Sequence, residues 1–216
     1  MKRNTMKVLV IGAGNMGAAF VRQLSAKGHT VRVTARDVAK AAPLAARYAN
    51  VQAVPAKGSS EGQDVVILAT AYDDAISALQ SVGNLQGKVV VDISNPLTAD
   101  YMGLTLGHST SAAEEIAKAI PGALIVKAFN TVLAQVLGQG ANLADGSQVT
   151  VFYAGDTASA KTVVQALAES LGFVTVDAGS LMNARIMHHI FRNARGADGT
   201  LASRKMGAVG NQWLAY

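Results

Sequence analysis

The residues with the clearest chemical potential are three glycines near the amino terminus, Gly12, Gly14 and Gly17, spaced as G-x-G-x-x-G. Glycines at this spacing permit a tight turn, a close approach of the backbone to a pyrophosphate, and close packing of a helix on a strand. The motif follows the apolar run from Lys7 to Ile11 and precedes a helical pattern, so the amino end of a helix would face the phosphates. The sequence therefore predicts a dinucleotide-binding turn.

The end of the second expected strand indicates which dinucleotide is bound. An NAD-binding protein usually places Asp or Glu there, where the carboxylate binds the ribose hydroxyls. Here the chain reads TARD from Thr34 to Asp37, with no acid at the strand end. The Arg36 guanidinium can form a forked pair with a 2′-phosphate and Thr34 can donate a hydroxyl, whereas Asp37 is better placed to cap the next helix. We therefore predict NADP(H) as the cofactor.

The elements that must position these residues can be read from the alternation of short apolar runs with helical patterns. The expected strands are Lys7 to Ile11, Thr30 to Thr34, Val51 to Val54, Val65 to Thr70, Lys88 to Ile93, Ala123 to Phe129, Val149 to Tyr153 and Phe173 to Val176. Helices are expected after Gly14, over Val38 to Tyr48, Asp73 to Val82 and Ser111 to Ile120, and after a cap at Asp156. A last helix is expected around Met182, Ile186 and Ile190. The stretch 133–147 is glycine-rich and shows little periodicity. This order predicts an α/β fold with a mostly parallel sheet, which binds ligands at the carboxyl ends of its strands.

Three apolar stripes recur at helical spacing, and each is expected to face the core. They are Met16, Phe20 and Leu24, then Val164, Leu167 and Leu171, and finally Met182, Ile186 and Ile190. Ser111 followed three residues later by Glu114 is the pattern of a capping box at a helix start.

Composition limits the other classes of function. Half of the 216 residues are hydrophobic and 15% are charged, which is typical of a compact globular protein. The chain has no cysteine, which excludes disulfides, Cys-ligated metals and thiol nucleophiles. Its net charge of +5 comes from the chain ends, because positions 8–184 hold 11 basic and 13 acidic residues. We therefore expect no nucleic-acid partner.

The amino-terminal segment is basic and then apolar, as in a secretion signal, but its apolar run from Val8 to Ile11 is too short for one. No stretch approaches the ~20 apolar residues of a membrane span. We therefore expect a cytoplasmic protein with no membrane partner.

Several short segments beyond the glycine motif carry a resemblance to a known family. They are Thr34-Ala35-Arg36, Ser94-Asn95-Pro96, Ser111-Ala112-Ala113-Glu114, Val126-Lys127-Ala128-Phe129-Asn130-Thr131, and Val176-Asp177-Ala178-Gly179-Ser180-Leu181 with Arg185. Taken in order, they resemble the coenzyme F-420-dependent NADP oxidoreductases, and equally the cytoplasmic NADPH domains of the six-transmembrane ferric reductases. The resemblance covers about Met6 to Phe191.

The resemblance implies a Rossmann-type, doubly wound domain with a small carboxyl-terminal α/β lobe. It also implies hydride exchange between NADP(H) and a small-molecule redox substrate, a deazaflavin (coenzyme F-420) or a flavin (FAD or FMN), in a homodimer. We place the NADP-binding domain at 6–131 and the small lobe with its basic tail at 132–216, packed together as one compact unit.

By the same resemblance, Thr70, Ala71 and Tyr72 line the adenosine or phosphate side of the cofactor, while Ser94, Asn95, Asn130 and Thr131 lie toward the nicotinamide. The residues expected to bind the cofactor are Gly12, Gly14, Asn15, Met16, Gly17, Thr34, Ala35, Arg36, Thr70, Ala71, Tyr72, Ser94, Asn95, Lys127 and Ala128. The catalytic residues stay unassigned, and Asn95, Asn130 and Thr131 are candidates for positioning.

Several of these residues also have a purely structural interpretation. Asn95 with the following proline could be a simple turn, Lys127 could be a buried charge paired with a carboxylate, and Asp177 could only orient the turn after it. His188 and His189 are adjacent, and neighbours on a helix diverge by about 100 degrees, so we expect no metal site there. The sequence shows no strong acid-base constellation, and hydride transfer between stacked rings requires none.

Two alternative functions remain open. The β-hydroxyacid and imine reductases also begin with this glycine pattern, but they carry a much longer helical second domain, and only 85 residues follow position 131 here. A non-enzymatic NADPH-binding module that reports redox state would need no acid-base residue either. The segment from Arg192 to Tyr216 is polar, basic and glycine-rich, whereas an apolar segment helps to wall the deazaflavin pocket in the resembling family. The sequence therefore does not identify the site of the hydride acceptor.

Overall fold

The structure is a computed structural model that describes residues 5–100, 103–143 and 146–193. Its strands are β1 (Lys7–Ile11), β2 (Thr30–Thr34), β3 (Val51–Ala53), β4 (Val65–Leu68), β5 (Val89–Asp92), β6 (Leu124–Ala128), β7 (Thr150–Gly155) and β8 (Val174–Asp177). Its helices are α1 (Asn15–Ala26), α2 (Val38–Ala45), α3 (Tyr72–Ser81), α4 (Ala112–Ala119), α5 (Ala134–Gln139), α6 (Ala158–Ser170) and α7 (Ala184–Asn193), with a short 3₁₀ turn, η1 (Leu181–Asn183), before α7. Each expected strand is present, with ends that differ by two residues or fewer.

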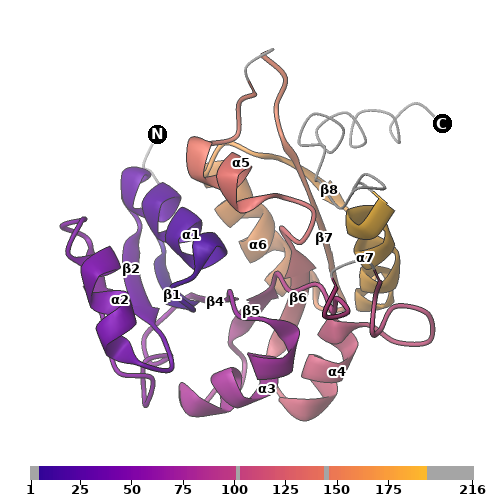
Figure 1. Cartoon of the computed structure of the whole chain (residues 1–216), viewed down its shortest axis with the longest axis horizontal. Helices are drawn as coiled ribbons and strands as arrows, with labels where there is room; N and C mark the ends of the chain where they lie inside the picture. The colour runs from indigo at the N-terminus through magenta and orange to yellow at the C-terminus, as the bar shows by residue number, and fades with distance from the viewer. Residues whose placement is uncertain (1–4, 101–102, 144–145, 194–216) are drawn as a thin grey trace.

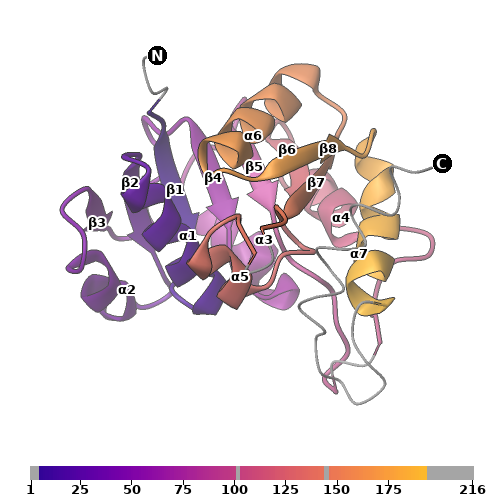
Figure 2. The same ribbon diagram turned by 90° about the horizontal axis from the view of Figure 1, so that it is seen from above.

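The strands form one eight-stranded sheet in the order β3-β2-β1-β4-β5-β6-β7-β8 (Figure 1). The first six strands in the chain are parallel to one another, β7 pairs antiparallel with β6, and β8 is parallel to β7. Figure 2 follows this order across the molecule from β3 to β8. The predicted α/β fold with a mostly parallel, doubly wound sheet is therefore confirmed. The division at residue 131 stays a prediction, since β6 and β7 are neighbours in the same sheet.

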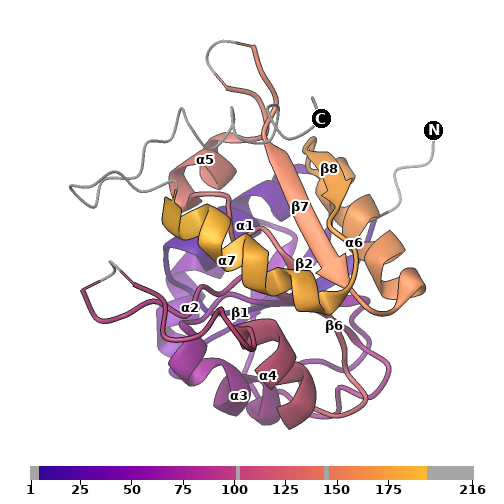
Figure 3. The same ribbon diagram turned by 90° about the vertical axis from the view of Figure 1, so that its right-hand side faces the viewer.

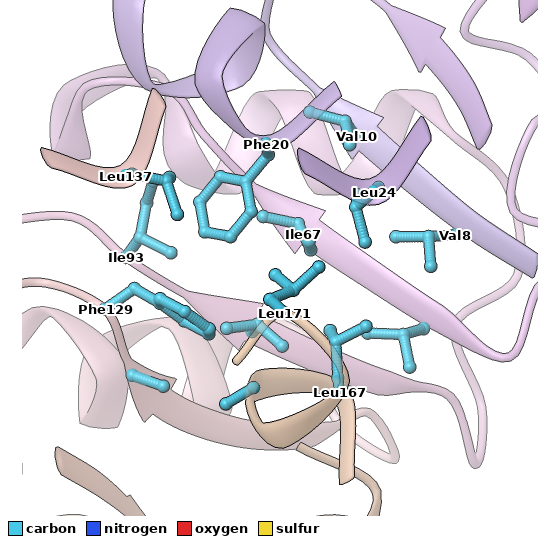
Figure 4. Close-up of a cluster of buried hydrophobic side chains, with 14 of the residues drawn as sticks. Val8, Val10, Phe20, Leu24, Ile67, Ile93, Phe129, Leu137, Leu167 and Leu171 are labelled. Carbon is cyan, nitrogen blue, oxygen red and sulfur yellow. The ribbon is translucent and has the colours of Figure 1, made fainter. Parts of the chain in front are cut away.

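Two hydrophobic layers cover the two faces of the sheet. Alternate residues of β1 point to opposite faces, so Val8 and Val10 join one layer while Leu9 and Ile11 join the other. The first layer receives side chains from α1, α2, α5 and α6, and Figure 4 shows part of it, with Ile67 and Leu171 between Phe20 of α1 and Leu167 of α6. The second layer receives α3, α4 and the start of α7, with α3 and α4 side by side in Figure 1. The carboxyl ends of β1, β2, β4 and β5 remain between these layers.

Two of the three predicted apolar stripes are confirmed. Phe20 and Leu24 are completely buried on α1, and Val164, Leu167 and Leu171 are buried on and just after α6. Met16, at the first turn of α1, is only partly buried.

The third stripe is wrong, because Met182 and Ile186 are 55% and 59% exposed and Ile190 is half-buried. The residues that face the core are Leu181, Ala184, Met187, His188 and Phe191. The reason is that Arg185 is held by Glu114 of α4 and that Leu181 and Ala184 pack into the second layer, so the face with Met182 and Ile186 turns outward. Figure 3 shows α7 lying beside α4.

The local capping predictions had different outcomes. The Ser111 side chain accepts a hydrogen bond from the Glu114 amide at 3.2 Å, which confirms the predicted start of α4. Asp156 does not cap α6, whose N-cap is Thr157. The Asp156 carboxylate instead accepts from the Leu181 amide at 2.9 Å and so joins the end of β7 to η1. Asp177 accepts from the Gly179 amide at 2.8 Å, in agreement with its expected role in that turn.

Within the described ranges, no helix is both long enough and apolar enough to cross a bilayer. The basic, glycine-rich tail expected at 192–216 lies outside the described residues from position 194 onward. The basic residues Lys2 and Arg3 at the other end of the chain also lie outside them.

Candidate functional site

The glycine turn between β1 and α1 gives each glycine a separate physical reason. Gly12 has φ +115°, and a Cβ there would lie 2.4 Å from the Ala69 carbonyl oxygen. A Cβ on Gly17 would lie 1.9 Å from the Gly12 carbonyl oxygen, whereas one on Gly14 would meet nothing within 4 Å. Gly12 is therefore needed where the turn passes the end of β4, and Gly17 is needed where α1 packs on the turn, whereas Gly14 leaves an open cradle in front of α1.

The amino end of α1 is available to an anion. Gly14 is its N-cap and no side chain caps the helix. The first amide groups of a helix have no partner within it, and the helix dipole adds a partial positive charge at this end. A phosphate group in front of Gly14 would be bound by these amides.

Two cavities lie at the carboxyl edge of the sheet, on either side of the glycine turn. The first, here called the Arg36 cavity, measures about 430 Å³. It is lined by Ile11, Gly12, Thr34, Ala35, Arg36, Ala56, Thr70, Asp74, Ser77, Ala78 and Ser81. The second, here called the Asn95 cavity, measures about 740 Å³. It is lined by Gly14, Asn15, Met16, Ala69, Thr70, Ala71, Ile93, Ser94, Asn95, Leu97, Phe129, Asn130, Val132, Leu133, Ala134 and Phe191. Thr70 lines both, so the two cavities adjoin.

The Arg36 cavity combines an exposed cation with buried hydroxyls. The Arg36 guanidinium forms an ion pair with Asp74 of α3 at 2.6 Å, and the Arg36 side chain is 82% exposed. The hydroxyl oxygens of Thr34 and Thr70 are buried without a hydrogen-bond partner in the described part of the chain. Asp37 caps α2 by accepting from the Ala39 amide at 3.0 Å, as predicted, and is not part of the cavity lining.

The Asn95 cavity is built around a network of neutral hydrogen bonds. Asn130 Nδ2 donates to Asn95 Oδ1 and to the Met187 carbonyl, both at 3.0 Å. Asn95 Nδ2 donates to the Asn130 carbonyl at 2.9 Å. His188 Nδ1 lies 3.1 Å from Asn95 Oδ1, an acceptor, so Nδ1 carries the ring proton. The network therefore ties the end of β5, the end of β6 and α7 together.

Burial keeps this network uncharged. His188 is completely buried, and burial lowers its pKa to about 2, with Lys127 and His189 adding to the effect. Within the described residues, the hydroxyl of Ser94 and Oδ1 of Asn130 are buried without a partner. Unsatisfied buried polar atoms are rare in native structures and indicate a missing ligand or water. Both residues line the Asn95 cavity.

Phe129 carries local backbone strain at the wall of the Asn95 cavity. Its φ is +59°, a left-handed conformation that costs a non-glycine residue about 1–3 kcal/mol. The Phe129 ring packs edge-to-face on Phe20 and Phe173, with centroids 5.0 and 5.8 Å apart. This packing holds the residue in place, and the turn that it starts presents Asn130 to the cavity.

Lys127 and Ala128 are completely buried and line neither cavity. Lys127 Nζ donates to Asp92 at 2.8 Å and to the Ser94 carbonyl, while Asp92 accepts from the Ser94 amide at 2.9 Å. Burial lowers the pKa of Lys127, and the Asp92 carboxylate opposes this shift. The structure therefore places Lys127 in a buried pair that shapes the strand end behind Ser94, and the contact of Lys127 and Ala128 with the cofactor stays a prediction.

Three other predicted site residues also lie outside the linings of the two cavities. Tyr72 begins α3 and Thr131 is buried, but neither lines the Arg36 cavity or the Asn95 cavity. Burial raises the pKa of Tyr72, with smaller contributions from Glu115, Asp73 and Asp92. Gly17 acts through the turn and not through the cavity surface.

Sequence reasoning missed two elements of the site. The first is the role of the predicted helix α3 in the site, since it contributes Asp74, Ser77 and Ser81 to the Arg36 cavity. Two acids in the first turn of a helix after the fourth strand were a usable signal, because that turn lies at the carboxyl edge of the sheet. The second is His188, whose partner on a distant strand end is set only by the packing of α7. As expected, His188 and His189 point to different partners, since His189 Nε2 lies 3.2 Å from the Gly107 carbonyl.

Comparison with known proteins agrees with this geometry. The family model described as coenzyme F-420-dependent NADP oxidoreductase matches residues 7–96. The crystal structure of a putative F-420-dependent NADP reductase from Arthrobacter sp. FB24 is similar over 91% of this chain and 96% of that one, with 30% identity and a TM-score of 0.80. Rat metalloreductase STEAP3 is 32% identical over 180 residues, and human metalloreductase STEAP2 is 27% identical over 182 residues. These matches cover 83% and 84% of this chain but only 35% of either relative's length.

An arginine at the end of the second strand, beside an open glycine cradle and in a chain with these relatives, places the protein among the NADP-dependent oxidoreductases with a Rossmann fold. Within that class, the chain belongs to the coenzyme F-420-dependent NADP oxidoreductase family, as the sequence resemblance predicts. Imine reductases such as that of Streptomyces aurantiacus share the fold at 24% identity and a TM-score of 0.62, with 61% of that chain covered.

Proposed function

We propose that the protein transfers hydride between NADP(H) and a deazaflavin or flavin bound in the Asn95 cavity. The observation that carries this proposal is chemical: among the described residues that line this cavity, none has a titratable side chain. Direct hydride transfer between two stacked rings needs positioning and exclusion of water, but no acid, base or metal. A neutral cavity of about 740 Å³ has room for the reacting ends of two ring systems.

The binding of the phosphate groups of NADP(H) at this edge of the sheet also supports the proposal. The open cradle at Gly14 and the uncapped amino end of α1 would hold the pyrophosphate. Arg36 and the unpartnered Thr34 hydroxyl would bind the 2′-phosphate, because a guanidinium forms strong charged hydrogen bonds to phosphate oxygens. The cofactor would thus span both cavities through the point where they meet at Thr70.

The residues of the Asn95 cavity would orient the reacting rings. The Ser94 hydroxyl and Asn130 Oδ1 offer hydrogen bonds that nothing in the described chain satisfies. Phe129, Val132 and Phe191 supply an apolar wall that excludes water. When bound, NADP(H) supplies or accepts the hydride at its nicotinamide ring. Asn95 and Asn130 therefore act as positioning residues in this proposal.

The names of two groups of relatives support the choice of acceptor. The structure described as a putative F-420-dependent NADP reductase matches over nearly its whole length, whereas the metalloreductases match over about a third of theirs. We therefore propose coenzyme F-420 as the first acceptor, with FAD or FMN as the alternative. From the same resemblance we propose a cytoplasmic homodimer.

Anaerobic stopped-flow mixing tests this function. The protein is mixed with NADPH and, in separate experiments, coenzyme F-420, FMN, FAD or a ferric chelate, and the loss of reduced nicotinamide absorbance is followed. We expect NADPH oxidation with F-420 or a flavin, and much slower reaction with NADH in place of NADPH. A protein that binds NADPH tightly but reacts with none of these acceptors would contradict hydride transfer and would favour an NADPH-binding sensor.

A further inference from the structure

The Arg36 cavity contains an acid as well as its arginine. Asp74 lines this cavity and its Oδ1 lies 2.6 Å from Nη2 of Arg36. The pair crosses from the end of β2 to the first turn of α3, which are separated in sequence by 38 residues. The guanidinium that we assign to the 2′-phosphate is therefore already paired with a carboxylate.

This ion pair is easily rearranged. The Arg36 side chain is 82% exposed and that of Asp74 is 49% exposed. Exposed ion pairs of this kind contribute little to stability, because water and salt screen them and because two long side chains lose freedom in forming them. An anion that offers more charge and several oxygens, such as a phosphate monoester, can displace the carboxylate.

The position of Asp74 on its helix does not by itself explain the pair. Acids are favourable in the first turn of a helix, and α3 has two of them, Asp73 and Asp74. Asp73 is exposed and is not part of the cavity lining, so it shares the helix-end effect without facing the cofactor site. The two neighbours therefore form a natural matched pair for experiment.

We propose that Asp74 is a specificity-determining residue that reduces the preference of the site for NADPH over NADH; this inference rests on the proposed NADP(H) site. Asp74 neutralises Arg36 when no 2′-phosphate is present and competes with that phosphate for the guanidinium. Toward NADH it has a second role, since a carboxylate at this edge can accept a hydrogen bond from a ribose hydroxyl, as acids do in NAD-binding Rossmann proteins.

Calorimetric titration of the Asp74→Asn and Asp73→Asn variants with NADPH and NADH tests the proposal. Asp74→Asn removes the competing charge and keeps the size of the side chain. We expect it to bind NADPH about three- to tenfold more tightly than the wild type and NADH no more tightly, so that the preference for NADPH rises. Asp73→Asn should stay within about twofold of the wild type.

Two further measurements separate this inference from the proposed function. 2′,5′-ADP and 5′-ADP report on the Arg36 cavity alone, and the gain in Asp74→Asn should appear with 2′,5′-ADP only. In an Arg36→Ala background the same Asp74→Asn change should give less gain, because the contested guanidinium is gone. Thermal unfolding of each variant checks that it is folded.

Equal NADPH affinity in Asp74→Asn and Asp73→Asn, or weaker NADPH binding in Asp74→Asn, would overturn the inference while leaving the NADP(H) site intact. A wild-type protein that binds neither NADPH nor 2′,5′-ADP would instead overturn the proposed function, and the inference with it.

Discussion

The two cavities at the edge of the sheet differ in how they are built. The Arg36 cavity depends on a charged, exposed ion pair between Arg36 and Asp74. The Asn95 cavity depends on buried neutral hydrogen bonds, with Asn130 only 2% exposed and His188 completely buried. The first arrangement can exchange partners at small cost, whereas breaking the second leaves buried polar groups unsatisfied.

Under the proposed function, the first cavity recognises the phosphate of the cofactor and the second holds the reacting rings. A site that distinguishes a phosphate from a hydroxyl benefits from an exposed, charged side chain that can exchange one partner for another. A site that must hold two rings in register benefits from a rigid, uncharged wall. The strained Phe129 backbone lies on the wall of the second cavity, where its cost is offset by the packing of its ring.

The largest effect is expected at the turn that the two cavities share, since Gly12 lines one and Gly14 the other. In Gly17→Ala the new Cβ would lie 1.9 Å from the Gly12 carbonyl oxygen, so the turn cannot keep its shape. We expect loss of NADPH binding by more than about 100-fold and a fall in Tm of roughly 5–15 °C. Calorimetry and thermal unfolding measure the two effects.

Gly14→Ala is the matched control for this turn, because its Cβ meets nothing in the protein and Gly14 has φ −75°. We expect an unchanged or slightly higher Tm with weaker NADPH binding, since the methyl group would stand in the cradle. A Gly17→Ala protein as stable as Gly14→Ala would show that the turn is not closed as described.

Charge recognition in the first cavity is tested by Arg36→Ala. A charged hydrogen bond contributes roughly 1.5–3 kcal/mol, so NADPH should bind about 10- to 150-fold more weakly, with NADH nearly unaffected. Binding constants for both cofactors, measured by calorimetry at the same salt concentration, check this result. Equal losses for NADPH and NADH would remove Arg36 from the recognition of the 2′-phosphate.

Acid should weaken the neutral network of the second cavity. Burial lowers the pKa of His188 from 6.5 to about 2. Between pH 2 and pH 6.5, His188 is therefore protonated in the unfolded chain but neutral in the folded protein. The contribution of His188 to stability is therefore complete well above pH 6.5 and is lost as the pH falls through 6.5, by roughly 1 kcal/mol at pH 5.5. Burial also lowers the pKa of His29, which adds in the same direction.

Urea unfolding of the wild type and of His188→Gln at pH 7.5 and 5.5 measures this contribution. We expect the variant to be less stable at pH 7.5 but to lose less free energy of unfolding on acidification. A variant with the same pH dependence as the wild type would show that His188 is not held neutral by the fold.

The smallest effect concerns the chemical step itself. Since none of the described residues that line the Asn95 cavity titrates, the single-turnover rate of hydride transfer should change by less than about twofold between pH 6.5 and 9. Stopped-flow single turnovers across this range provide the measurement. A sigmoidal or bell-shaped profile would reveal an acid or base that the cavity description lacks.

Much of the fold could be predicted from the sequence because its strands are short apolar runs bounded by glycines and polar turns. The glycine motif, the cap at Asp37 and the arginine at the end of β2 are local features, and local features can be read along the chain. The helix α5 was missed because it has six residues in a glycine-rich stretch, too few to show a period.

The parts that could not be predicted depend on contacts between distant segments. The stripe of Met182 and Ile186 has helical spacing, but the packing of Leu181 and Ala184 and the Arg185–Glu114 pair decide which side of α7 is buried. In the same way, the meeting of Arg36 with Asp74 and of Asn95 with His188 follows from packing across the sheet.

The most direct test of the account is calorimetric titration of the wild-type protein with NADPH and with NADH under identical conditions. The geometry of Arg36, Thr34 and the glycine cradle predicts binding of both, with NADPH tighter by at least about tenfold. Equal dissociation constants, or no heat of binding with NADPH, would contradict it.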